Sequence, residues 1–462
     1  TMDDPRELIL CDVRCFQDAQ RGNLRPITLL VGENSTGKTT FLGCYRALHQ
    51  AFAGFDLDSL LDFNEEPFVM GSFRDIVRSR RGPGGRIDEF QLGLSVVPKS
   101  TGRIPSYRVL ITFRDEDSQP AIASFRFEFQ SDSFLELERD PEGTVLRTPD
   151  RQVAAHFPFG QAVFLLDYLM ALVGEDSQTF SPPSQGLQPV ADYLRDLFSR
   201  HKPKTRKARR AAGKRIGLLR PQLPELIPIA PLRSKPMRTY NPVSETASPE
   251  GGHIPMLMMR LNRTNQSHWK SLHDDLVAFG RGSGLFSDIK VKRHGRQMSD
   301  PFQLQVKVRT GPHANITDVG YGVSQSLPIL VDVMAATESD RVGGRRRRDP
   351  GGRMFLLQQP EVHLHPRGQA ELANLFVDAF RKSGSRFLIE THSDYIVDRM
   401  RIAVRKGTLK SDDVSILYFE PTGNAVTIHN MTLDDYGNLE GAPPGYRDFF
   451  LKETDQLLGF SD

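Results

Sequence analysis

One stretch constrains the fold more than any other, because a β-rich run ends directly in a glycine loop. It is "RPITLLVGENSTGKTT", and "FLGCYRALHQAF" continues it with helical spacing. Gly32, Gly37, Lys38 and Thr39 satisfy G-x-x-x-x-G-K-[ST], in which backbone N–H groups wrap a phosphate at the start of a helix. Lys38 would reach the outer phosphates and Thr39 would bind Mg²⁺. The chain is therefore predicted to bind ATP or GTP through Asn34, Ser35, Thr36, Gly37, Lys38, Thr39 and Thr40.

Composition sets only broad limits. The 462 residues are enough for two or three domains, and 60 Lys or Arg against 57 Asp or Glu leave the chain only mildly basic. We find neither a secretory signal pattern nor a run of about 18 apolar residues. Three cysteines, Cys11, Cys15 and Cys44, lack a second pair for a zinc site. A cytoplasmic protein with buried thiols and no membrane partner is expected.

Other segments indicate how the chain is organised around the loop. Alternating apolar residues from Phe90 to Phe129 predict antiparallel strands beside the nucleotide-binding core. Gln161 to Gly174 is predicted to be helical. The basic runs at 200–215 and 341–353 are either solvated insertions or segments that bind the phosphates of DNA or RNA.

Three further motifs follow in the second half of the chain. "DVGYGVSQSLPIL" places Ser324 at the start of an apolar helix, where it suits an anion or serves as a simple N-cap. "RMFLLQQPEVHLHP" and "RFLIETHS" each show a buried strand followed by polar residues. Because ligands bind at the carboxyl ends of parallel strands, these polar residues should share one sheet edge with the phosphate loop.

The four motifs in this order resemble ATPases of the ATP-binding-cassette (ABC) class, in the soluble branch with the SMC, RecF and OLD proteins. They are most similar to the prokaryotic AAA-type predicted ATPases, with "DVGFGVSQ-LPIL", "LLEQPE-HLHP" and "IETHS". "IAPLRSKPMRTY" and "GAPPGYRDFFLKETDQLL" also look like stretches of that family. The resemblance implies an α/β fold, an ABC-type P-loop ATPase with a mixed central sheet, an antiparallel β subdomain and a helical signature lobe. The expected division is 1–174 and 337–462 for the two ATPase lobes, and 175–336 for the helical and insertion lobe.

The resemblance also implies residue roles. Ser324 would contact the γ-phosphate of an ATP held by a second subunit, and His392 would hydrogen-bond that phosphate within its own subunit. Arg14 in "DVRCF" would approach the phosphates, although an exposed strand residue is an equal alternative. Residues 71–77 would couple the nucleotide to the helical lobe. For His363 and His365 a subunit-contact role is favoured over metal binding.

The chain departs from the family at one strand end. Cassette ATPases carry an acid for the Mg²⁺ shell and then a glutamate for the attacking water, and this family usually has Glu then Gln. Here Gln358 and Gln359 occupy both places. An amide cannot accept a proton or supply negative charge to a metal, so ATP hydrolysis should be impaired more than ATP binding. Either the chain is a natural ATPase that uses Glu361 or Glu390 instead, or Gln358 was introduced in place of a glutamate to trap the ATP-bound state, which the otherwise intact pattern favours.

The expected function is an ATPase switch of a bacterial anti-phage system. A head-to-tail dimer, or a higher homo-oligomer, would hold ATP between subunits and control a separate effector, a nuclease, in answer to a phage protein. The alternative is a RecF-like or SMC-like ATPase of DNA repair whose basic runs grip DNA.

Overall fold

The computed structural model describes residues 4–446, except 54–61, 80–86, 99–103, 131, 156, 162–164, 167–168, 170–186, 200–220, 222, 243–245, 298, 343–351 and 445. Most of the expected helix at 161–174, the basic run 200–215 and the Arg345 to Arg348 cluster lie outside the described residues. So does most of the closing "GAPPGYRDFFLKETDQLL" stretch.

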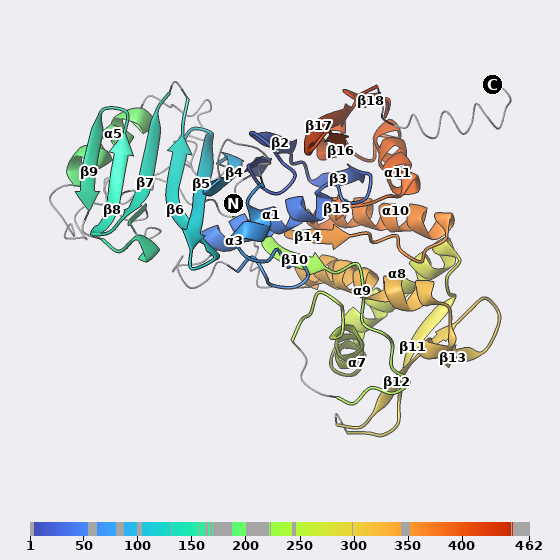
Figure 1. The fold of residues 1–462 in the computed structure, drawn as a ribbon. Coiled ribbons are helices and arrows are strands. Elements are labelled where there is room, and N and C mark those ends of the chain that lie inside the picture. Colours follow the sequence, from blue (N-terminus) through green and yellow to red (C-terminus); the bar gives the residue numbers. More distant parts are fainter. Residues whose placement is uncertain are drawn as a thin grey trace.

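A seven-stranded mixed sheet forms the centre of the molecule (Figure 1). Its order is β10 (Glu225–Ile229), β14 (Arg353–Gln358), β15 (Arg386–Glu390), β3 (Ile27–Gly32), β16 (Val414–Thr422), β17 (Ala425–Leu433) and β18 (Leu439–Glu440). The first five strands are parallel, and β17 and β18 complete the sheet in antiparallel pairing. Strands β3, β14 and β15 are almost wholly buried, which explains their continuous apolar sequences.

An eight-stranded antiparallel sheet extends to one side (Figure 1). Its order is β2 (Gln20–Asn23), β1 (Asp4–Cys11), β4 (Glu89–Val97), β5 (Tyr107–Glu116), β6 (Gln119–Glu128), β7 (Phe134–Asp140), β8 (Gly143–Thr148) and β9 (Arg151–Ala155). The alternation between Phe90 and Phe129 therefore forms β4, β5 and β6, as predicted. Hydrogen-bonded ion pairs such as Arg126 with Glu136 join neighbouring strands.

Helices cover both faces of the central sheet. On one face lies α1 (Lys38–Ala53), and on the other lie α7 (Ile254–Thr264), α8 (Gln266–Ser283), α9 (Tyr321–Val342), α10 (Pro366–Ser383) and α11 (Asp394–Arg405). Two further helices, α3 (Phe73–Ile76) and α5 (Gln188–Ser199), pack with the antiparallel sheet (Figure 1). On β14, Met354 and Leu356 belong to the core that contains α1 and the antiparallel sheet. Phe355 and Leu357 belong to the core built with α7 to α11. Alternate side chains of the central strands therefore enter two different cores.

A small sheet of β11 (Asp288–Arg293), β12 (Phe302–Lys307) and β13 (His313–Asn315) lies beside α7 and α8 (Figure 1). The mixed central sheet, antiparallel β subdomain and helical lobe expected from the sequence are confirmed. Strand β10 lies within the expected lobe 175–336 but pairs with β14 of the central sheet. In the part of the chain that is described, no helix combines the length and apolar character needed to cross a membrane.

Candidate nucleotide-binding site

The phosphate loop connects β3 to α1, and its two motif glycines lie where only glycine fits. Gly37 has φ of +87°, and a Cβ there would lie 2.6 Å from Sγ of Cys15. Gly32 has φ of +141°, and its Cβ would lie 2.7 Å from the carbonyl oxygen of Phe419. A side chain at either position would strain the backbone and clash. The glycines thus let the loop pack closely against the segments behind it.

Lys38 is buried inside the loop, with 2% of its surface exposed. Its Nζ donates to the carbonyl oxygens of Gly32 at 3.0 Å and of Glu33, and lies 3.4 Å from Oγ1 of Thr36. Burial lowers the pKa of the ammonium, and the carboxylates of Glu390 and Glu33 oppose that shift. The loop therefore orients its own lysine, which is what a phosphate ligand requires.

Thr39 meets a carboxylate from the neighbouring strand. Its Oγ1 donates to Oε2 of Glu390 at 2.8 Å, and Glu390 is the last residue of β15. Burial raises the pKa of Glu390, whereas the hydrogen bond from Thr39 and the charge of Lys38 lower it. Hydroxyl and carboxylate oxygens are the ligands that Mg²⁺ accepts beside a nucleotide, so these residues fit the ion. When bound, Mg²⁺ would neutralise phosphate charge at this point.

Gln358 ends β14 and lies in register with Glu390 on β15. It is 4% exposed, and its buried Oε1 has no hydrogen-bond partner among the described residues. A buried amide oxygen of this kind can accept a hydrogen bond or contact a cation. As a neutral group, Gln358 fits the Mg²⁺ shell less well than Glu390.

The residues after the two strand ends are tied to each other. The N–H of Gln359 donates to the carbonyl of Glu390 at 2.8 Å, and the N–H of His392 donates to Oε1 of Glu361 at 2.7 Å. Glu361 is 7% exposed, burial raises its pKa, and its Oε2 is buried without a partner. His392 is exposed at the surface, but partial desolvation of its ring and the charge of Lys38 lower its pKa. His392 therefore sits on the same sheet edge as the phosphate loop.

Arg233 is a site residue that motif analysis did not select. It is 5% exposed, and its Nη2 lies 3.5 Å from the carbonyl oxygen of Gln358 and 3.4 Å from that of Gln359. Its Nε and Nη1 are buried without partners. Burial lowers its pKa to about 10, against the opposing charge of Glu361. The available signal was an arginine four residues after a buried strand end, in "IAPLR".

Arg14 lies close to the loop but is engaged by protein groups. Its Nη1 donates to Oγ1 of Thr40 at 3.1 Å, its Nη2 to the carbonyl of Met70 at 2.9 Å, and its Nε to the carbonyl of Asp75 at 3.1 Å. These bonds fasten the first turn of α1 to residues 70–75. A phosphate contact by Arg14 stays a prediction, and so do the roles of exposed Asn34 and Ser35.

Ser324 is not brought to the phosphate loop. It lies in the first turn of α9, is buried, and donates to the carbonyl of Tyr321 at 3.1 Å. Residues of α9 pack in the core on one face of the central sheet, whereas residues of α1 pack in the core on the other face. The contact of Ser324 with a γ-phosphate remains a prediction.

The two histidines of "HLHP" have local roles in the fold. His365 is the N-cap of α10, where it accepts from the N–H of Arg367. The ring of His363 lies 5.7 Å from that of exposed Tyr321. Throughout the described ranges, no group of three or more His, Cys, Asp or Glu could hold a metal ion.

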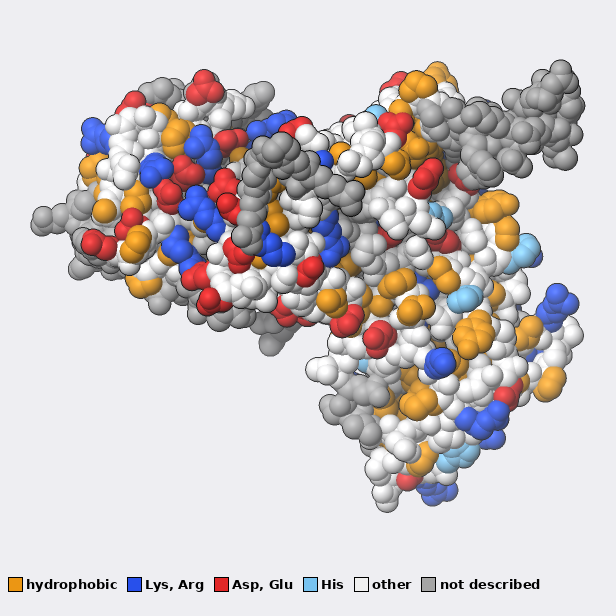
Figure 2. Space-filling view, in the orientation of Figure 1, with side chains coloured by type: hydrophobic (Ala, Val, Ile, Leu, Met, Phe, Trp, Pro, Cys, Tyr) orange, Lys and Arg blue, Asp and Glu red, His pale blue; other side chains and the backbone are white. Residues whose placement is uncertain are grey.

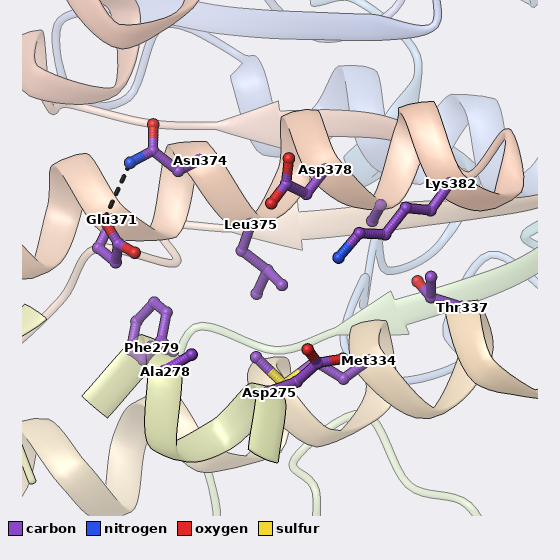
Figure 3. A pocket seen from close by; sticks show the side chains of 11 residues that line it. Asp275, Ala278, Phe279, Met334, Thr337, Glu371, Asn374, Leu375, Asp378 and Lys382 are labelled. Atoms are coloured by element: carbon purple, nitrogen blue, oxygen red, sulfur yellow. Dashed lines mark hydrogen bonds between the residues drawn. The ribbon is translucent and has the colours of Figure 1, made fainter. Parts of the chain in front are cut away.

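A separate cavity of about 110 Å³ lies between α8, α9 and α10 (Figure 3). Leu375 of α10 points toward Phe279 of α8 and Met334 of α9 from the opposite side, and the charged side chains of Asp275, Asp378, Glu371 and Lys382 also line the cavity (Figure 3). No phosphate-loop residue lines it. It is therefore distinct from the nucleotide site.

Comparison with known proteins supports an ATPase. A family described as an AAA ATPase domain matches residues 258–397, which include Ser324, Gln358 and His392. No curated protein matches the chain. The match covers less than half of the chain, so over this segment the chain is similar to an ATPase domain, and a domain of that kind implies nucleotide binding.

Among solved structures, the chain is similar to SMC heads. An Smc head domain with an extended coiled coil, bound to the C-terminal domain of ScpA and derived from Pyrococcus furiosus, shares 9% identity and a TM-score of 0.40, covering 99% of both chains. An SMC head domain from Thermotoga maritima shares 10% identity and a TM-score of 0.35, covering 92% of this chain and 97% of the other. At this level of similarity, nothing about partners follows for this chain.

Proposed function

We propose that the chain is an ABC-class ATPase that acts as an ATP-dependent molecular switch. The observation that carries this proposal is the arrangement at one sheet edge. Lys38 and Thr39 of the phosphate loop face Glu390, and His392 follows two residues later on the same strand end. This arrangement can bind a nucleoside triphosphate with Mg²⁺, and His392 would contact its γ-phosphate.

A second copy of the chain completes the site in this proposal. Ser324 begins a helix on the face of the sheet opposite α1, so a head-to-tail partner would bring its own Ser324 to the ATP. A helix N-terminus suits the γ-phosphate because its N–H groups point toward the anion. ATP would then join two protomers, and its loss would release them.

A mixing experiment tests the shared site. Lys38→Ala should abolish ATP binding, and Ser324→Arg should keep ATP binding but prevent ATP-dependent assembly. A mixture of the two variants rebuilds one complete site, from the loop of one protomer and the Ser324 of the other. Native mass measurement with ATP should therefore show assembly of the mixture but of neither variant alone. An unmodified chain that stays monomeric with ATP bound would contradict the proposal.

Turnover is proposed to be slow, because Gln358 and Gln359 replace both carboxylates of the hydrolytic strand end. Gln359 cannot act as a general base, a role that contributes about 10²- to 10⁴-fold to a rate, and Gln358 supplies no negative charge to the Mg²⁺ shell. We expect Gln358→Glu to raise ATP turnover in a phosphate-release assay. Equal rates would show that Gln358 is not a replaced glutamate.

From the motif resemblance we propose a place in bacterial anti-phage defence. The ATPase subunit of the PARIS system is the kind of protein the chain resembles. The switch would hold or release a separate effector, a nuclease, when a phage protein is present. Native mass measurement of the complex purified with its operon neighbours tests this, and purification without an effector would count against it.

A DNA-repair ATPase is the alternative. It relies on basic runs that lie largely outside the described residues. In Figure 2, Lys and Arg side chains over the antiparallel sheet are interspersed with Asp and Glu, so that face shows no continuous basic patch. Deleting 200–215 and the Arg345 to Arg348 cluster tests the alternative. The alternative predicts that the DNA affinity of the unmodified chain falls steeply as salt is added. If the deletion leaves DNA affinity unchanged, the alternative loses its main support.

A further inference from the structure

The register of two neighbouring strands places an acid where the nucleotide's metal would be held. Gln358 and Glu390 are partners in the parallel β14–β15 pair. Met354, Leu356 and Leu388 belong to the core on the α1 face, so Gln358 and Glu390, which lie an even number of residues further on, point to that face too. The hydrogen bond from Thr39 to Glu390 agrees with this direction.

The order of the strands places Glu390 nearer to the phosphate loop than Gln358. β15 lies between β14 and β3, so Glu390 is one strand from the phosphate loop and Gln358 is two. Glu390 is also fixed in place, since its carbonyl accepts from the N–H of Gln359 at 2.8 Å. Its carboxylate is 6% exposed, and Lys38 lies close enough to influence it electrostatically. A buried acid beside the threonine of a phosphate loop is well placed to balance a divalent cation.

We propose that Glu390 of β15 supplies the negative charge of the Mg²⁺ shell beside Thr39, in place of Gln358 of β14. This inference rests on the proposed ATP binding. It adds that the chain binds Mg²⁺ together with ATP even though residue 358 is a glutamine. Hydrolysis would still be slow, because Gln359 offers no carboxylate to polarise water.

Binding of Mn²⁺, as a paramagnetic substitute for Mg²⁺, tests the proposal without using turnover. Electron paramagnetic resonance measures Mn²⁺ affinity of the protein with saturating ATP, and a fluorescent ATP analogue in EDTA measures nucleotide affinity without metal. Glu390→Gln should weaken Mn²⁺ binding by about tenfold or more, as loss of a metal-supporting group does. Its affinity for the analogue in EDTA should stay within about twofold, because the loop and Lys38 are untouched.

The double variant Glu390→Gln with Gln358→Glu returns a carboxylate to the adjacent strand and should recover most of the Mn²⁺ affinity. Glu371→Gln, on α10 in the lining of the cavity of Figure 3, is the matched carboxylate-to-amide control and should leave Mn²⁺ affinity unchanged. If Glu390→Gln does not fold, Glu390→Asp keeps the charge, shortens its reach and should give an intermediate loss.

Two results would overturn the inference, and they can be told apart. Unchanged Mn²⁺ affinity in folded Glu390→Gln or Glu390→Asp would refute the role of Glu390 while leaving ATP binding intact. Failure of the unmodified chain to bind the analogue either with Mg²⁺ or in EDTA would refute the proposed function together with the inference.

Discussion

At the scale of single residues, the carboxylate of Glu361 is buried just after the end of β14. One of its oxygens accepts from the N–H of His392, and the other is buried without a partner. Burial raises its pKa above the ordinary value of 4.5. The folded chain therefore keeps this proton at pH values where the unfolded chain has lost it, so Glu361 costs stability as pH rises through that range.

The substitution Glu361→Gln tests whether Glu361 lowers stability as pH rises. Glutamine keeps an oxygen for the N–H of His392 but cannot ionise. We expect the free energy of unfolding of Glu361→Gln, relative to the unmodified chain, to increase as pH rises from 4.5 toward neutrality. Urea unfolding at several pH values measures it, with Glu371→Gln as the control exchange. A difference that does not change with pH would contradict the prediction.

Much of the site could be predicted from motifs because their residues are consecutive. Lys38 and Thr39 follow from the loop pattern, and Glu390 and His392 follow from a buried strand with polar residues at its end. The contact between Thr39 and Glu390 could not be predicted, since it depends on β15 lying next to β3. Arg233 was missed for a similar reason, because its neighbours at 358 and 359 are more than a hundred residues away.

At the scale of elements, the same contrast appears. Local alternation predicts β4, β5 and β6, and apolar runs predict β3, β14 and β15. Neither pattern reveals that β10 joins the central sheet, because the pairing of β10 with β14 is a long-range contact. The three-stranded sheet of the helical lobe was likewise not anticipated.

The carboxylate of Asp288 joins the sheet of β11, β12 and β13 to α8. Asp288 on β11 contacts Nε2 of His273 on α8 and Nε2 of His313 on β13, both at 2.8 Å. Burial raises the pKa of Asp288, but the hydrogen bonds from His313 and His273 outweigh it and leave the pKa lowered. The stability supplied by Asp288 is therefore present above the ordinary pKa of 3.8 and lost as pH falls through the lowered value.

We expect Asp288→Asn to lower the free energy of unfolding by about 1–3 kcal/mol at neutral pH, the usual range for hydrogen bonds to a charged group. The loss should shrink in acid as Asp288 is protonated. Thermal unfolding from neutral to acid pH measures it, and Asp300→Asn, in the turn between β11 and β12, is the control exchange. An equal loss at all pH values would show that the ionised carboxylate is not what joins these elements.

At the scale of the whole molecule, Arg233 links α9 to the end of β14. Its backbone N–H lies 3.4 Å from Oε1 of Gln325 in α9, and its guanidinium lies beside the carbonyls of Gln358 and Gln359. Glu361, which contacts His392, is its nearby counter-charge. We propose that Arg233 couples the proposed ATP site to the first turn of α9, where Ser324 lies.

Arg233→Met removes the charge and the donors while keeping similar bulk. We expect ATP binding to persist but ATP-dependent protection of residues 321–325 in hydrogen exchange to weaken, by about 0.5–2 kcal/mol of coupling. Arg238→Met is the matched control, because Arg238 forms an exposed ion pair with Asp318 just before α9. Undiminished protection in Arg233→Met would exclude Arg233 as the link.

The β14–β15 register has a mechanical consequence. A metal held by β14 would pull on the loop that leads to α10, whereas one held by Glu390 pulls on the strand that runs through Thr391 and His392 into α11. In the proposed switch, His392 would detect the γ-phosphate and Glu390 would support the cation, and the two residues lie two positions apart on one segment. Phosphate release and metal release would reach α11 as a single displacement instead of two.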